Sequence, residues 1–189
     1  SKTDKHVKAL LNNGKPLIQL NMSEMNQLGG EMFRWSFATI IAGHLLMVNP
    51  FDQPNVQEAK DFTVETLNSL ETDKELNDFE VPISLDSLLD NIKPGKYFAL
   101  LVYLSQSPEV DSVLQEIRSS LLRRKQIATT SGYGPRYLHS TGQLHKGGPQ
   151  KGVFLQIVSS TGEKLIIPGE KYDFRVLVDS QARGDMIAL

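Results

Sequence analysis

The sequence of 189 residues contains no cysteine, which excludes disulfide bonds and metal sites built on thiolates and is compatible with a reducing compartment. It also lacks an excess of either charge, because 20 lysines and arginines stand against 22 aspartates and glutamates. A net charge this close to zero gives no reason to expect nucleic acid or a membrane surface as a partner.

Long apolar runs are missing as well. Arg34 and His44 bracket the longest one, which is too short to span a bilayer. The N-terminus shows no signal-peptide pattern, and it begins at Ser1 rather than Met, so we expect a piece of a longer polypeptide. The length and the 40% of hydrophobic residues predict one domain over residues 1–189.

Apolar runs and turn residues predict strands that alternate with helices. Lys96 to Leu104 is almost continuously apolar, as expected for a central strand that is buried on both faces. Shorter strands are predicted over residues 16–20, 126–130 and 153–158, with an extended piece over 165–167. Helices are predicted over residues 1–13, 31–47, 54–67, 83–89, 108–125 and 174–188. This alternation predicts an α/β fold, a mostly parallel sheet with helices on both faces.

Two regions stand out around this core. Residues 31–47 carry apolar side chains around most of the helix, which predicts burial on more than one side against the sheet. Residues 71–93 begin acidic and poor in apolar residues, which predicts a surface excursion. Between them, residues 49–54 form a rigid corner, because Pro50 keeps Asn49 out of the α region and Pro54 suits the first turn of a new helix.

The corner and the helix that follows it resemble the C-terminal signature of glucose-6-phosphate isomerases. The matching residues are Phe51, Asp52, Gln53, Val56 and Lys60, while Asn55 stands where that family usually has Gly or Ala. The resemblance implies that Lys60 helps to open the sugar ring and that Gln53 contacts the substrate. Apart from the resemblance, Lys60 is an ordinary solvated lysine on the Val56 side of a helix.

A second candidate is the polar stretch over residues 131–150, which contains five glycines, two histidines, an arginine and a lysine. A loop this long inside a compact domain is usually functional or disordered. It follows a predicted parallel strand, at the edge where α/β sheets bind ligands. Arg136, Lys146 and backbone N–H groups could hold a phosphate there.

His139 and His145 are the candidate acid–base groups of this stretch, since imidazole titrates near neutral pH. A metal site is a weaker hypothesis, because the stretch has two histidines and no carboxylate. The alternative interpretation is a structural loop whose histidines bind backbone groups.

The same stretch is similar to the C-terminal loop of bacterial proteins that join a transaldolase to a glucose-6-phosphate isomerase. The resemblance covers essentially the whole chain and implies a sugar-isomerase (SIS-like) domain, a cytoplasmic enzyme, no cofactor and a sugar phosphate as substrate. It also implies that Gln143 contacts the substrate. In ordinary isomerases the catalytic histidine directly follows Asn-Gly-Gln, whereas here Leu144 follows Gln143. The catalytic role therefore stays open between His139 and His145.

The isomerase phosphate-binding segment and its base glutamate are not found in the sequence. We therefore expect an upstream isomerase domain of the same chain, and we expect the isolated domain to be inactive. Whether a transaldolase domain is present and whether the protein forms homo-oligomers both stay open. Two alternatives remain, a non-catalytic sugar-phosphate-binding module and a domain that only buttresses an enzyme core.

Overall fold

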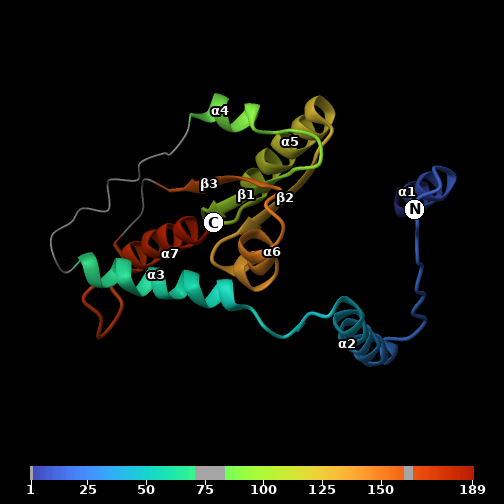
Figure 1. The fold of residues 1–189 in the computed structure, drawn as a ribbon, viewed down its shortest axis with the longest axis horizontal. Helices are drawn as coiled ribbons and strands as arrows, with labels where there is room; N and C mark the ends of the chain where they lie inside the picture. The colour runs from blue at the N-terminus through green and yellow to red at the C-terminus, as the bar shows by residue number, and fades with distance from the viewer. Residues whose placement is uncertain (1, 71–83, 160–163) are drawn as a thin grey trace. The chain divides into compact units, whose positions relative to one another are not determined.

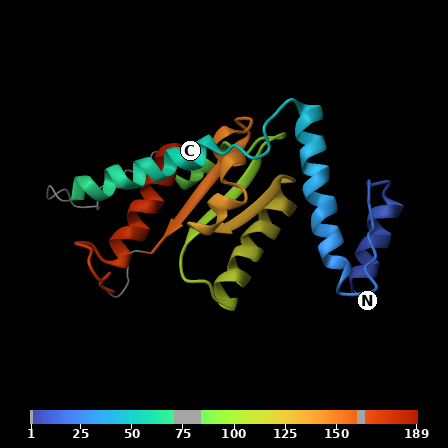
Figure 2. The same cartoon turned by 90° about the horizontal axis from the view of Figure 1, so that it is seen from below.

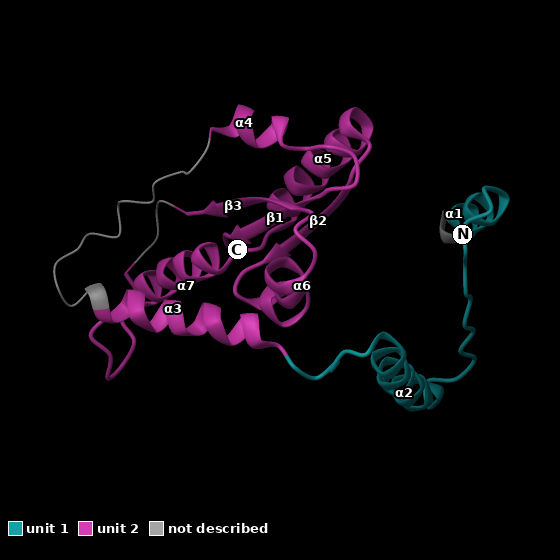
Figure 3. Ribbon diagram, in the orientation of Figure 1, with its two compact units in different colours: residues 1–52 teal, residues 53–189 magenta. Residues whose placement is uncertain are grey.

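The computed structural model describes residues 2–70, 84–159 and 164–189 (Figure 1). The chain divides into two compact units, residues 1–52 and residues 53–189 (Figure 3). The length and composition predict one domain, and the boundary between the units lies inside the corner at residues 49–54.

The first unit contains two helices, α1 (Lys2–Asn12) and α2 (Gln27–Leu46). Helix α1 ends before Gly14, as predicted, and Gly14 adopts the left-handed conformation with φ of 63°. The strand predicted over residues 16–20 is wrong, because this segment has no strand structure. A strand requires a neighbour to pair with, and the described part of this unit contains no other strand.

Helix α2 was predicted to be buried on more than one side, and the first unit by itself does not bury it. Phe33 is 73% exposed and Trp35 is 60% exposed, and the only buried residue of the helix is Gly43. Two helices and their linkers are too small to enclose a core. The helix includes the two glycines at 29–30 and ends where Met47 adopts the left-handed backbone conformation.

The second unit is built on a three-stranded parallel sheet in the order β2-β1-β3. Strand β1 (Tyr97–Tyr103) lies in the centre, with β2 (Ala128–Tyr133) and β3 (Gly152–Val158) on its two sides. Every residue of β1 after Tyr97 is buried, which confirms the predicted central strand. Strand β2 begins and ends later than residues 126–130.

Helices cover both faces of this sheet, as Figures 1 and 2 show. Helices α4 (Leu85–Asp90) and α5 (Pro108–Lys125) pack on the face formed by Phe98, Leu100 and Val102. Helices α3 (Pro54–Leu70) and α7 (Phe174–Ala188) pack on the opposite face, against the residues of β1 that alternate with these. The predicted α/β fold with a parallel sheet is confirmed.

The helix ends follow local signals in the sequence. The Ser107 side chain accepts a hydrogen bond from the backbone N–H of Val110 at 3.3 Å, and Pro108 occupies the first turn of α5. Asp173 caps α7 in the same way, by accepting from the N–H of Val176 at 2.9 Å. Of the predicted excursion over residues 71–93, residues 71–83 lie outside the described residues, and α4 forms most of the remainder.

The stretch at 131–150 is a compact crossover rather than the irregular loop that we predicted. Its first residues complete β2, and a 3₁₀ helix η1 (Arg136–His139) and helix α6 (Gly142–Gly147) follow. Tyr137 and Leu138 are buried against the sheet, on the same face as α3 and α7. These apolar anchors are too few to give a recognisable periodicity, so burial of the segment was not visible in the sequence.

None of the described helices has the length and apolar character needed to cross a membrane. The described residues also contain no cluster of three or more histidine, aspartate or glutamate side chains arranged to hold a metal ion.

Candidate functional site

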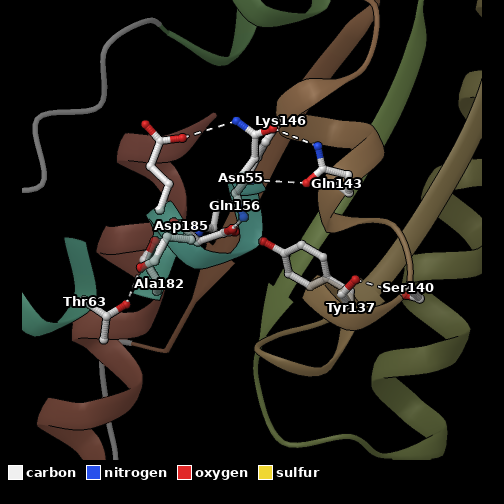
Figure 4. A network of polar contacts seen from close by, with 11 residues as sticks. Asn55, Thr63, Tyr137, Ser140, Gln143, Lys146, Gln156, Ala182 and Asp185 are labelled. Atoms are coloured by element: carbon white, nitrogen blue, oxygen red, sulfur yellow. Dashed lines mark hydrogen bonds and ion pairs between the residues drawn. The ribbon is translucent and has the colours of Figure 1, made fainter. Parts of the chain in front are cut away.

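Two predicted site residues of α6, Gln143 and Lys146, form polar contacts with α3 and α7 (Figure 4). Gln143 binds the first turn of α3. Its carbonyl oxygen accepts from the backbone N–H of Asn55 at 3.2 Å, and its amide nitrogen donates to the Asn55 side chain at 2.8 Å. The first N–H groups of a helix have no partner within the helix, so Gln143 supplies one. It therefore fastens α6 to the start of α3.

Lys146 forms an ion pair with Asp185 of α7, and neither side chain has any exposed surface. Burial lowers the pKa of Lys146 to about 8, and the nearby charge of Glu58 opposes this shift. Burial raises the pKa of Asp185 to about 7. Burial and the negative charge of Asp185 also raise the pKa of Tyr103, which ends β1 beside this pair. Because neither charge has access to water, each is stabilised only by the other, and the ion pair therefore links α6 to α7.

His145 occupies an aromatic pocket at the other end of β1. Its Nδ1 lies 2.9 Å from the hydroxyl of Tyr97, and its ring packs against Phe154 with ring centres 5.3 Å apart. The side chain is only 7% exposed. Burial, and then the charge of Lys146, lowers the pKa of His145. A neutral, enclosed imidazole of this kind binds Tyr97, so it is not in a position to contact a bound ligand.

The other candidates are exposed and lie apart from this network. Arg136 begins η1 and donates to the Gln106 side chain at 2.9 Å, near the carboxyl ends of the strands. His139 is exposed at the end of η1, and Gln53 is exposed before α3.

Lys60 is exposed on α3, although its neighbours Val56 and Ala59 are buried. Among the described residues, it makes no hydrogen bond or ion pair. No hydrogen bond, ion pair or ring contact joins Lys60 to His139 or His145. The structure thus engages Gln143, His145 and Lys146 in three separate packing contacts and leaves Lys60 outside all of them.

Sequence reasoning missed Asp185, the carboxylate on which Lys146 depends. The signal was the run of small residues in the final helix, since Ser180, Ala182 and Gly184 are all buried and bring α7 close to its neighbours. A carboxylate next to such residues must lie in a tightly packed interface. Such a position requires a partner of opposite charge.

Comparisons with protein-family models, with curated proteins and with solved structures found no match for this chain. The resemblance to glucose-6-phosphate isomerases consequently rests on the residues of the corner and of the crossover.

Proposed function

We propose that this chain is the C-terminal domain of a cytoplasmic glucose-6-phosphate isomerase, which interconverts glucose 6-phosphate and fructose 6-phosphate without a cofactor. In this proposal the domain contributes Lys60 to ring opening, and an upstream domain of the same polypeptide provides the phosphate site and the base glutamate. The observation that supports the proposal is the position of Lys60. Its ammonium is exposed and unpaired among the described residues, on a helix that Val56 and Ala59 anchor to the core.

The chemistry requires a group that can give a proton to the ring oxygen and another that can remove one from the anomeric hydroxyl. A lysine on a fixed helix can donate the first proton to a sugar that a neighbouring domain holds. Of the two histidines, the exposed His139 is the better candidate for the second step, because His145 is occupied with Tyr97. Arg136 is the exposed cation of the crossover and can contact the phosphate.

The test is Lys60→Ala in a polypeptide that joins this chain to an upstream isomerase domain. Production of glucose 6-phosphate from fructose 6-phosphate is followed through a coupled dehydrogenase. We expect kcat to fall by about 10²- to 10⁴-fold, the usual contribution of one acid–base group, with little change in KM. Lys93→Ala, at another exposed lysine, is the matched control and should keep full activity. Turnover of Lys60→Ala within about twofold of the control would contradict the proposal.

A purely buttressing domain is the second candidate, and the crossover favours it. Gln143, His145 and Lys146 all make packing contacts, so a stretch that looked reactive holds α3, α6 and α7 together. In that case Lys60→Ala leaves kcat and KM unchanged, whereas Lys146→Met lowers the stability of the domain. A sugar-phosphate-binding module without a catalytic role would instead show a change of substrate affinity alone in Lys60→Ala.

A further inference from the structure

The second unit contains a cleft of about 730 Å³ that no part of the proposed function uses. It opens where β1 and β3 end. Its lining includes the segment after β1, Lys164, and the first turns of α7. All of the side chains that we predicted from the sequence for substrate binding or catalysis lie outside this lining.

The topology explains why a cleft opens at this point. Strands β1 and β3 are parallel neighbours, with Tyr103 paired to Val158 at their carboxyl ends. From these ends the chain continues to opposite faces of the sheet, from β1 to α5 and from β3 to α7. Connections that diverge from adjacent parallel strands leave a crevice between them, and α/β proteins bind their ligands in such crevices.

The lining of the cleft carries one more cation than carboxylates, and the carboxylate of Asp173 caps α7 beside it. Two cations, Lys164 and Arg175, stand against one carboxylate, Asp179. The Arg175 guanidinium is held in place by Asp179, with Nε 3.3 Å from Oδ2, and by the carbonyl oxygen of Ser159 at 3.4 Å. A guanidinium carries five N–H donors in a rigid fork, so donors remain for an anion. Arg175 also lies in the first turn of α7, where the helix dipole adds to the positive potential.

The rest of the lining is mainly apolar, which limits the kind of anion that fits. Leu104, Val110, Phe174 and Val178 contribute hydrocarbon surface, and the Tyr103 ring contributes an aromatic wall. A sugar would place several hydroxyl groups against these side chains without hydrogen-bond partners, which costs free energy. An aryl or alkyl group would instead gain from burial of its apolar surface.

We propose that this cleft binds a small organic anion, a phosphate monoester or a carboxylate, that carries an apolar body. The anionic group contacts Arg175 and Lys164, and the apolar body lies between Phe174 and Val178 of α7 and the Tyr103 ring. This site is independent of Lys60, so it stands whether or not the domain takes part in sugar isomerisation.

The experiment is a ¹H–¹⁵N NMR titration of the 189-residue chain with phenyl phosphate, benzoate, inorganic phosphate and fructose 6-phosphate. We expect phenyl phosphate or benzoate to shift the amide signals of Ser105 and Arg175, with affinity at least about tenfold above those of inorganic phosphate and fructose 6-phosphate. The relative affinity of the two aryl probes identifies the anionic group as phosphate or carboxylate.

Arg175→Gln should weaken the tighter aryl probe by about tenfold or more, because it removes the charged fork that binds the anion. Lys125→Gln, which removes the same charge at the distant end of α5, should leave the affinity unchanged, and so should Lys60→Ala. If Arg175→Gln does not fold, as judged by circular dichroism, Lys164→Gln at the rim of the cleft takes its place. The proposal is overturned if neither aryl probe shifts these signals, if fructose 6-phosphate binds most tightly, or if the substituted cleft binds as well as the native one.

Discussion

Removal of the Lys146 charge is the sharpest test of how the second unit is held together. Lys146→Met keeps most of the side-chain volume but leaves the carboxylate of Asp185 without its partner in a site with no exposed surface. The protein then either keeps an unpaired charge buried or protonates Asp185. Whichever route costs less free energy sets the loss of stability.

The magnitude follows from these two routes. An unpaired buried charge costs about 3–5 kcal/mol. Protonation costs about 1.4 kcal/mol for each pH unit above the ordinary pKa of the carboxyl, which is 3.8. At pH 8 that route costs more than 5 kcal/mol, so we expect a loss of roughly 3–5 kcal/mol. At pH 5 the carboxyl is already protonated in the folded native chain, because its pKa there is about 7, so no unpaired carboxylate is left and the loss should be small.

The sign of the pH dependence agrees with the position of Asp185. Burial raises its pKa to about 7 in the folded chain, so the folded state binds the proton more tightly than the unfolded state does. The stability that this proton brings is complete below pH 3.8 and is lost as the pH rises through about 7. Lys146→Met removes the cation that pairs with the ionised carboxylate, so its deficit should be larger in neutral or mildly alkaline solution, where Asp185 is ionised, than in acid.

Urea unfolding measures the effect, followed by the near-ultraviolet circular dichroism of tyrosine. All five tyrosines lie in residues 53–189 and the single tryptophan, Trp35, lies in residues 1–52, so the tyrosine signal reports on the second unit. A loss of 4 kcal/mol lowers the urea midpoint by about 2 M for a slope of about 2 kcal/mol per molar. Lys93→Met, at an exposed lysine, should shift the midpoint by less than about 0.3 M. The reasoning fails if Lys146→Met matches this control at pH 8, or if its deficit is equal at pH 5 and pH 8.

Two further predictions concern the packing around this pair. Burial lowers the pKa of His145, so its contribution to stability is present above the ordinary pKa of imidazole, near 6.5, and is lost as the pH falls through its lower folded value. The difference in free energy of unfolding between the native chain and His145→Phe, measured with urea, should accordingly become smaller as the pH is lowered from 7 to 5. A difference that stays constant would show that protonation of His145 does not affect stability in this range. Gly184→Ala should destabilise the second unit by about 1–3 kcal/mol, because the new Cβ would lie 2.7 Å from the backbone nitrogen of Thr63. Gly30→Ala has open space around it and should cause no loss in thermal unfolding, and a Gly184→Ala midpoint equal to that of Gly30→Ala would rule out the tight α3–α7 contact.

Local chemistry was sufficient for much of the second unit. The Ser107-Pro108 start of α5, the apolar run of β1 and the spacing of α7 are each contained within a short stretch of sequence, and the structure confirms them. The segment at 16–20 shows the limit of this reasoning. Its composition is that of a strand, but a strand forms only if another strand is available for pairing.

The candidate site shows a similar limit. The sequence singled out Gln143, His145 and Lys146 because their residue types suit catalysis and anion binding. The structure places them against Asn55, Tyr97 and Asp185, which are distant along the chain, and this explains why these partners could not be found from spacing. Arg175 and Lys164 were missed because neither belongs to a recognisable motif, and only the divergence of β1 and β3 brings them to one cleft.

The sequence alone determined the fold class, the order of most helices and strands, and the corner before α3, since these depend on residues within a few positions of each other. The tertiary structure decided which polar side chains are buried, which helix faces are exposed and where a cleft opens. Burial and electrostatic pairing depend on contacts between distant segments, so the burial of Lys146 against Asp185 was decided only by the folded structure.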